Sequence, residues 1–522
     1  MNGFSNKLKG YFATENAFRS AMTALVIALV LVFNILIYVL GSAFGLYFYT
    51  IEKQDLTISG ATDALFAEAI EDGREVSILF CQPRDDVLAN ENGAYVLNTA
   101  EQFAERYPDF IKIEFVNIIT KRDSKGNRVD LGKYVMKDEE GNDKPIYSTS
   151  VIFASEGGSH TVLTDDYTSD GYAPFFTLTP GQTGFYATSY NGEEIIAATA
   201  CYVLAPEEEH KVVYFTQYHG ESADPALYTL LTSAGYTVKM IDLRFNDIPK
   251  DAAMLYISAP VKDFERAAEG SGIVTEIERL EEYMAGGGVL FAAIDPYSVS
   301  KLPVLTSFLS EHGISIATTA DADGKVLPSL VRDSNSAITA DGFTLVAEYA
   351  SSDAADRIYD RISTFGGCVI IKSVAALNLK EGSTAKPILQ SSESSVLQSG
   401  GVTVNSDGGY CIAAMATVEN APSDKNSDGK DGKMFVVPSI YLTAADALIA
   451  NGYSNKDFTF SVFEEIAEAE NLPYNCKEVL YDTQTLENLS MGTARIYTAL
   501  IMAIPACLAV IGAVVIIKRK NR

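Results

Sequence analysis

Positive charge is scarce in this chain, and the shortage excludes one class of partners. The 522 residues include 40 Lys and Arg against 68 Asp and Glu, which gives a formal net charge of -28 at pH 7. Several basic residues lie at the two ends of the sequence, so the long middle is more acidic still. An acidic surface repels nucleic acid and anionic headgroups, and it can attract cations or basic partners. We therefore exclude nucleic acid as a partner.

Cysteine pairs are lacking as well, and tryptophan is absent altogether, which by itself indicates no function. The six cysteines are scattered, and Cys507 lies inside an apolar stretch. The other five form no Cys-x-x-Cys pair and are odd in number. Such a distribution predicts neither a disulfide framework nor a zinc site.

The sequence has none of the common catalytic or nucleotide-binding signatures. We find no G-x-x-x-x-G-K-[ST] phosphate loop, and no G-x-G-x-x-G follows a predicted strand. A G-x-S-x-G turn and an H-E-x-x-H helix are missing too. We therefore expect no catalytic residues and no cofactor, and any ATP hydrolysis must come from a partner.

Two uncharged apolar stretches bracket the chain, at 21–49 and 496–517. About 20 apolar residues in a helix cross a hydrocarbon core, so each stretch is long enough to span a membrane. Basic residues precede the first stretch and follow the second, and basic flanks favour the cytoplasm. The sequence thus predicts a cell-membrane protein with both termini in the cytoplasm and residues 50–495 outside. A removable signal peptide ending near Ala43-Phe44-Gly45 is the alternative for the first stretch.

The middle is too long for a single hydrophobic core, so we expect two extracytoplasmic domains. From 50 to 205 the pattern mixes predicted helices, at 59–70, 94–107 and 193–204, with strands. This predicts a small mixed α/β domain, for which a thioredoxin-like fold is one option. The predicted strands are 76–81, 111–116, 150–154 and 161–164, and the polar stretch 121–144 is predicted to be a loop or hairpin.

From 206 to 475 short apolar strands are each followed by a turn and an amphipathic helix, which is typical of a parallel sheet wrapped by helices. We expect a larger, doubly wound, flavodoxin-like α/β domain. Gln390–Gly401 is rich in serine and is predicted to be a loop. The chain then continues through a juxtamembrane tether at 476–495 to the second span. The basic tail at 518–522 is predicted to be cytoplasmic, as is the N-terminal segment at 1–20. The predicted strands of this domain are 212–216, 237–243, 254–258, 289–294, 343–346, 368–371, 410–414 and 434–437.

A polar turn follows the first strand of the larger domain. In wound sheets ligands gather at the carboxyl ends of the strands, which makes Tyr218, His219, Gly220 and Glu221 a candidate ligand- or partner-binding site. Asp295 follows another strand and could face the same cleft. The alternative is that the glycine makes a tight turn and the polar groups satisfy the backbone.

Asp424, Asn426 and Asp428, followed by Gly429, copy the first half of a calcium loop. The copy is incomplete, because Phe435 stands where a bidentate Glu is needed. A solvated hairpin tip explains the same composition without metal.

Several of these motifs, in their order along the chain, resemble those of the auxiliary extracytoplasmic ABC-transporter subunits related to the gliding-motility-associated transport protein. Asp55–Ser59 resembles the family's opening, and Tyr190–Glu193 its domain junction. Val213–Glu221 is similar to its distinctive strand and Gly-His-Gly-Glu turn, although Tyr218 replaces the first Gly. Gly286–Pro296 also matches, whereas Val437–Ile440 departs from the Gly-Asp-Ser type of strand end.

The resemblance implies a non-catalytic subunit that works with a separate ABC ATPase and a multi-span permease, and it does not imply gliding motility. Membrane lipid is the second expected partner, and a small-molecule or carbohydrate ligand the third. Two alternatives stay open. One is a membrane-anchored hydrolase with His219 as base and Glu221 orienting it, and the other is a ligand sensor, which the short tails disfavour.

Overall fold

The computed structural model describes residues 56–137, 141–164, 173–181, 184–268, 270–422, 426–448 and 452–480. It shows a mixed α/β architecture with several sheets, as the sequence predicts. Helices in the described ranges are all too short or too polar to cross a membrane. The two predicted spans, 21–49 and 496–517, lie outside the described residues, as do both predicted cytoplasmic segments.

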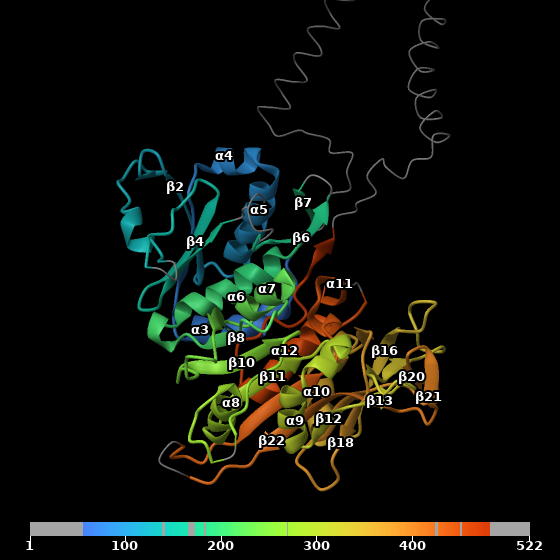
Figure 1. The fold of residues 1–522 in the computed structure, drawn as a ribbon. Coiled ribbons are helices and arrows are strands. Elements are labelled where there is room, and N and C mark those ends of the chain that lie inside the picture. Colours follow the sequence, from blue (N-terminus) through green and yellow to red (C-terminus); the bar gives the residue numbers. More distant parts are fainter. Residues whose placement is uncertain are drawn as a thin grey trace, which may run out of the picture. The chain divides into compact units, whose positions relative to one another are not determined.

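The first part of the chain builds a five-stranded sheet in the order β3-β2-β1-β4-β5 (Figure 1). β1 and β2 are parallel, and β4 is antiparallel to β1. The strands are β1 (Val76–Phe80), β2 (Ile111–Asn117), β3 (Arg122–Asp123), β4 (Ser150–Ser155) and β5 (His160–Thr164). The helices are α3 (Ala61–Glu71), α4 (Arg84–Ala89), α5 (Glu91–Arg106) and α6 (Gly192–Leu204).

Alternation of side chains along β1 explains how this sheet is covered. Val76, Ile78 and Phe80 pack with apolar residues of α3, α5 and α6 in one core cluster. Leu79 points to the other face and packs with Leu131, which a short 3-10 helix at Leu131–Tyr134 supplies. The predicted polar excursion 121–144 therefore covers the second face of the sheet. Successive strand residues point to opposite faces, so both faces need such a cover.

A hairpin that the sequence pattern does not reveal precedes α6 and packs into the core cluster of the first sheet. It consists of β6 (Phe176–Gly181) and β7 (Gly184–Tyr190), and β24 (Val479–Leu480) pairs antiparallel with β7. The start of the predicted tether is thus part of the folded body, and Cys476 is buried in it. The rest of the tether, beyond 480, lies outside the described residues.

The second part builds a nine-stranded sheet in the order β17-β16-β19-β22-β23-β11-β10-β8-β9. The five strands from β23 to β9 are parallel, and the rest are antiparallel. The sheet is therefore mixed where the sequence predicts a parallel one. The strands are β8 (Val212–Thr216), β9 (Thr237–Ile241), β10 (Ala252–Ser258), β11 (Val289–Ala293), β16 (Thr344–Tyr349), β17 (Val369–Lys372), β19 (Lys386–Gln390), β22 (Cys411–Val418) and β23 (Gly432–Val437).

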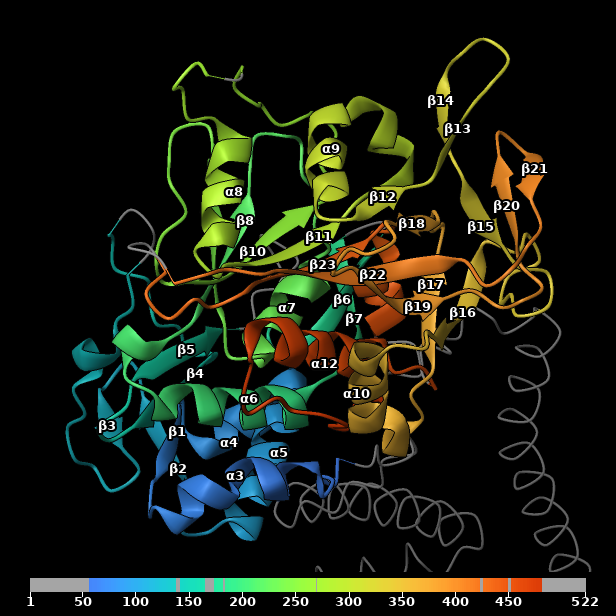
Figure 2. The ribbon, with the colours of Figure 1, turned by 90° about the horizontal axis from the view of Figure 1, so that it is seen from below.

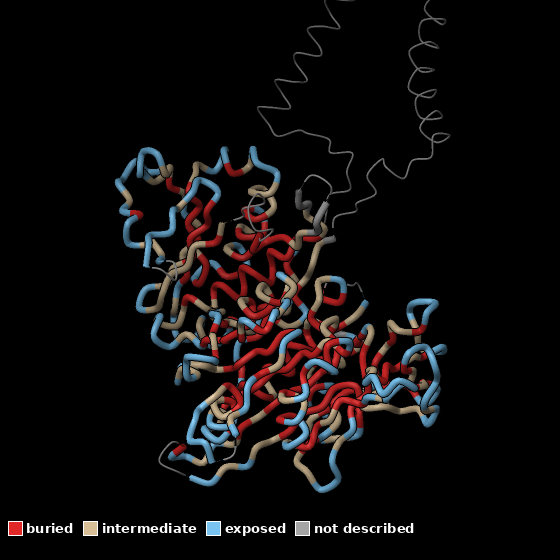
Figure 3. Tube along the Cα trace, in the orientation of Figure 1, coloured by how far each residue is buried: buried red, intermediate tan, exposed pale blue. Residues whose placement is uncertain are grey.

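Helices cover both faces of this sheet, as Figure 2 shows. On β23, Phe435 points into the cluster formed with α7, α10 and α12, and its neighbours Met434 and Val436 point into the cluster formed with α8 and α9. Buried residues follow the central strands in Figure 3. The helices are α7 (Pro225–Ser233), α8 (Glu276–Ala285), α9 (Pro303–Glu311), α10 (Asp353–Ile362), α11 (Ala445–Leu448) and α12 (Asn455–Ala467).

The serine-rich stretch Gln390–Gly401 is not a loop throughout, so that prediction is wrong. It contains β20 (Val396–Ser399), which pairs with β15 (Leu330–Arg332) and β21 (Val402–Asn405). Three of its serines can be buried because their hydroxyls are hydrogen-bonded: Ser392 donates to Asp333, and Ser391 bonds Ser395 at 2.7 Å. The buried hydroxyl of Ser399 has no hydrogen-bond partner among the described residues. Smaller pairs are β12 (Ile314–Ile316) with β18 (Leu377–Leu379) and β13 (Thr318–Ala320) with β14 (Val326–Pro328).

Candidate functional site

The turn after β8 is tight, and its backbone explains two of its residues. Tyr218 and Gly220 both have positive φ, at 79° and 73°. A Cβ on Gly220 would lie 2.6 Å from Cγ2 of Val261, so glycine is needed there for space as well as for conformation. The carbonyl oxygen of His219 accepts hydrogen bonds from the backbone N–H groups of Val261 and Lys262, both at 2.9 Å. The turn is thus fixed against the segment that follows β10.

His219 points inward from this turn and lies between two carboxylates. Its side chain is only 4% exposed. Nδ1 is 2.9 Å from Oε1 of Glu221, and Nε2 is 2.9 Å from Oε1 of Glu276 at the start of α8. The imidazole ring stacks on Phe264 with centroids 4.0 Å apart. Nδ1 is therefore hydrogen-bonded, whereas Nε2 is within ion-pair distance of Glu276 but outside hydrogen-bond geometry, and Oε1 of Glu276 has no hydrogen-bond partner among the described residues.

The two carboxylates decide the charge of the imidazole. Burial lowers the pKa of His219, but Glu221 and Glu276 outweigh burial and raise the pKa to about 9. Burial raises the pKa of Glu221, whereas the bond to His219 outweighs it and brings the pKa below its ordinary value. With a pKa of about 9, the side chain of His219 is an imidazolium at neutral pH. Such a group has no lone pair to accept a proton, so it is poorly suited to act as a general base.

Glu276 is the residue of this site that the sequence analysis missed. It is the first residue of α8, whose start is fixed by a capping box between Thr275 and Glu278. Its second oxygen accepts a hydrogen bond from the backbone N–H of Glu265 at 2.8 Å. The Thr-x-x-Glu spacing could have located the start of the helix. That Glu276 lies beside His219, which is 57 residues earlier in the chain, depends on the fold and could not be predicted from the spacing.

Tyr218 points outward and belongs to a different surface. Its side chain is 57% exposed, and the guanidinium of Arg244 lies 4.3 Å from the ring centroid. Arg244 is held in turn by Asp242, through two hydrogen bonds of 2.9 Å. The four residues of the predicted turn are therefore one buried side chain (His219), one half-buried side chain (Glu221), one glycine close to Val261 and one exposed aromatic ring.

Asp295 serves the backbone of its own turn. Its side chain accepts hydrogen bonds from the N–H of Tyr297 at 3.1 Å and from the hydroxyl of Ser298 at 3.2 Å, and it caps a 3-10 helix at Pro296–Lys301. It follows β11, which is separated from β8 by β10. The structure thus brings His219, Glu221 and Glu276 together and leaves Asp295 at another strand end.

The calcium-like loop is only partly described, because Asp424 lies outside the described residues. The Asn426 amide bonds backbone groups: Nδ2 donates to the carbonyl of Lys430 at 2.7 Å, and Oδ1 accepts from the N–H of Lys430 at 2.8 Å. Asp428 is exposed and accepts from Ser427 at 3.0 Å. Within the described ranges no three His, Cys, Asp or Glu side chains are grouped as a metal site would require.

A second buried cluster lies at the junction of the two parts of the chain. Glu193, in the first turn of α6, accepts hydrogen bonds from the N–H of Ser59 at 2.9 Å, from the Ser59 hydroxyl at 2.6 Å and from the N–H of Lys477 at 3.0 Å. Its neighbour Glu194 forms an ion pair with Lys456 of α12. Burial raises the pKa of Glu478 nearby. We call Glu193, Glu194 and Lys456 the junction cluster.

Comparisons with known proteins show distant structural similarity only. No family model matches it, and no curated protein matches it. Among solved structures, it is similar to the mmIFT52 N-terminal domain, at 15% identity and a TM-score of 0.33 over 49% of this chain and 96% of that one. It is also similar to a glutamine amidotransferase from Thermotoga maritima, at 10% identity and a TM-score of 0.27 over 50% and 99% of the two chains. At such low scores and identities, none of these likenesses assigns a fold family or an activity to this chain.

Proposed function

We propose that this chain is a non-catalytic, membrane-anchored auxiliary subunit of an ABC transporter. In this proposal residues 21–49 and 496–517 span the cell membrane, and the body between them works outside the cytoplasm with a separate ATPase and a multi-span permease. Its motifs resemble those of the auxiliary subunits related to the gliding-motility-associated transport protein. The lack of any nucleotide-binding signature supports a division of labour in which another subunit hydrolyses ATP.

The observation that carries this proposal is the convergence of the two ends of the described body. Ser59 near its start and Lys477 near its end both donate to Glu193, and β24 pairs with β7. A body held by one membrane helix at each end needs both connecting segments to leave from the same place. The junction cluster meets that requirement. It also gives a physical role to the Tyr190–Glu193 segment, which resembles the domain junction of the family.

The finer fold assignments belong to the same proposal. Numbered in chain order, the parallel strands β9-β8-β10-β11-β23 follow the order 2-1-3-4-5, which is the flavodoxin-like order. The first sheet has a parallel β1/β2 pair with β4 and β5 added antiparallel, and this supports the thioredoxin-like option. Cys81 follows β1, but burial raises the pKa of its thiol to about 11, which does not suit redox chemistry.

Tyr218 replaces the first Gly of the Gly-His-Gly-Glu turn, but its backbone conformation still supports the resemblance. Glycine is the residue that most easily adopts positive φ, and Tyr218 has φ of 79°. The turn thus keeps the backbone that a Gly-His-Gly-Glu sequence would favour. The hydrolase alternative lacks such support, because Nε2 of His219, the nitrogen not bonded to Glu221, lies 2.9 Å from the buried Oε1 of Glu276 and the side chain is only 4% exposed.

Purification of the tagged full chain from its native membranes in a mild detergent tests the proposal. We expect an ABC ATPase and a multi-span permease to be recovered with it. We expect Glu193→Ala, which frees the segments at Ser59 and Lys477, to lower their recovery, and the exposed Glu208→Ala to leave it unchanged. Recovery of the chain alone would contradict the proposal.

A further inference from the structure

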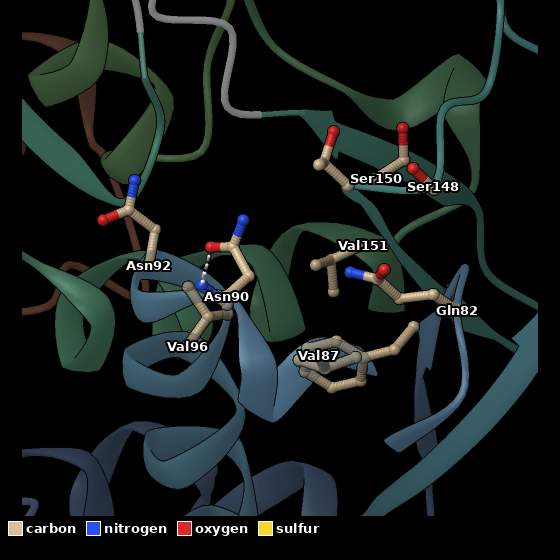
Figure 4. A pocket seen from close by; sticks show the side chains of 11 residues that line it. Gln82, Val87, Asn90, Asn92, Val96, Ser148, Ser150 and Val151 are labelled. Carbon is tan, nitrogen blue, oxygen red and sulfur yellow. Dashed lines mark hydrogen bonds between the residues drawn. The ribbon is translucent and has the colours of Figure 1, made fainter. Parts of the chain in front are cut away.

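A cavity of about 140 Å³ lies at the carboxyl end of β1, between the start of α5 and the segment that enters β4 (Figure 4). Six of its lining residues are polar: Gln82, Asn90, Asn92, Ser148, Thr149 and Ser150. Ser148 and Thr149 are exposed, so the cavity can be reached from solvent. It is formed within the first part of the chain, away from the His219 turn.

The hydrogen-bonding groups around this cavity are largely unused. The side chains of Gln82, Asn92, Ser148 and Thr149 make no hydrogen bond to the described residues. Asn90 caps α5 by accepting from the N–H of Gly93 at 3.0 Å, and this leaves its amide NH₂ free of that bond. In Figure 4 the Asn90 and Gln82 amides point toward the same space. Amides and hydroxyls can both donate and accept.

Charge is absent from the lining, although the chain as a whole carries a net charge of -28. None of the lining residues is Asp, Glu, Lys, Arg or His. No lining side chain supplies an opposite charge for an ion. The start of α5 could attract an anion, but the N–H of Gly93 there is already bonded to the side chain of Asn90. The lining therefore favours a neutral ligand with several hydroxyl or amide groups.

The size and the floor of the cavity narrow the ligand further. An apolar cavity of about 150 Å³ holds one six-membered ring, and pockets for larger ligands start at roughly 300 Å³. The floor is apolar and includes Phe80, Val87 and Val151. A ring with C–H groups on one face and hydroxyls at its edge would match both the floor and the rim.

We propose that this cavity binds one sugar ring of a neutral carbohydrate. The Gln82, Asn90 and Asn92 amides and the Ser148 and Thr149 hydroxyls would bond the ring hydroxyls, and the apolar floor would contact its C–H face. That the bound sugar is a transported substrate or a surface glycan rests on the proposed function. Binding itself does not depend on a transporter partner.

The test uses the purified full chain in detergent and saturation-transfer NMR with neutral trisaccharides of glucose, galactose and N-acetylglucosamine. We expect at least one of them to bind, and a galacturonate trimer to bind no better than buffer controls. The double variant Gln82→Ala/Asn92→Ala should weaken binding at least tenfold. Thr149→Trp should abolish it by filling the cavity, and Asn98→Ala, on the exposed side of α5, should leave it unchanged.

Three outcomes would overturn the inference. They are no binding of any neutral sugar at millimolar concentration, equal binding by Thr149→Trp, and capture of a peptide in place of a sugar. Unchanged melting temperatures of the variants establish that they are folded. A chain that binds sugar but purifies without an ATPase and permease contradicts only the proposed function. A chain that recovers these partners but binds no sugar contradicts only this inference.

Discussion

The turns after β1 and after β8 occupy equivalent places in their sheets, yet their polar groups are used in opposite ways. After β8, His219, Glu221 and Glu276 bind one another in the interior. After β1, the neutral side chains of Gln82 and Asn92 face a cavity and bond no described residue. We therefore interpret the charged turn after β8 as a structural element that stabilises the fold, which we call a lock, and the neutral turn after β1 as the one that can bind a ligand. A conspicuous charged motif in a sequence need not mark the ligand-binding site of a protein.

The largest difference between the two turns should appear when one polar group is removed from each. Glu276→Ala leaves the buried His219 with a single carboxylate, and breaking a buried ion pair costs about 3–5 kcal/mol. Gln82→Ala removes no internal bond and should change the free energy of unfolding by less than ~0.5 kcal/mol. Chemical denaturation of the full chain measures both. Similar small losses in the two variants would show that the β8 turn is not a lock.

The pH dependence of stability should also separate the two turns. The pKa of His219 is raised from 6.5 to about 9, so its stabilisation is fully present below pH 6.5 and is lost as the pH rises through 9. At ~1.4 kcal/mol per pKa unit, the rise from 6.5 to about 9 corresponds to a loss of about 3.5 kcal/mol. The same titration of His219→Gln, which removes the charge, should lack this component. Identical pH profiles for the two chains would contradict the ion-paired state.

A smaller effect is expected from the glycine that lets the β8 turn approach its neighbour. Gly220→Ala forces a left-handed conformation on alanine, which costs ~1–2 kcal/mol, and brings its Cβ against Val261. Gly73→Ala is the matched control, because Gly73 has φ of 67° but no atom within 4 Å of a new Cβ. Thermal unfolding should show a larger loss for Gly220→Ala. Equal losses would mean that the Val261 contact adds nothing.

The smallest effects concern the two capping residues beside these turns. Asp295→Ala and Asn90→Ala each remove an N-cap and should each cost about 1 kcal/mol in unfolding free energy. Only Asn90 lines the cavity, so only Asn90→Ala should also weaken sugar binding. Parallel unfolding and NMR binding experiments compare the two. Weaker binding in Asp295→Ala would argue that the cavity and the larger sheet are coupled.

The sequence revealed the elements of this fold better than their arrangement. Short apolar runs located β8, β10 and β11, because these strands are buried on both faces of the sheet. The sequence could not give strand direction, since β22 and β23 look alike whether they run parallel or antiparallel. It missed β20, because the serines before this strand are typical of a solvated loop, whereas Ser392 is in fact buried and donates to Asp333.

For the candidate sites too, the sequence indicated residues that are close in the chain but not those that only the fold brings together. His219 and Glu221 could be paired because they are two residues apart, whereas Glu276 requires the fold to bring α8 to the turn. The cavity joins residues near 82 and 92 with residues near 149, none of which belongs to a recognisable motif. Glu193 was noted only as part of a junction resemblance, and its bonds to Ser59 and Lys477 depend on contacts between distant segments.

The proposed placement of the body outside the cytoplasm is tested most directly by labelling single cysteines in intact cells with a membrane-impermeant maleimide. The chain would carry Asn98→Cys on the exposed surface of α5, or Asn521→Cys in the basic tail, with the native cysteines replaced by alanine. Our account predicts that position 98 is labelled in intact cells and position 521 only after permeabilisation. Labelling of position 521 in intact cells, with position 98 protected, would contradict it.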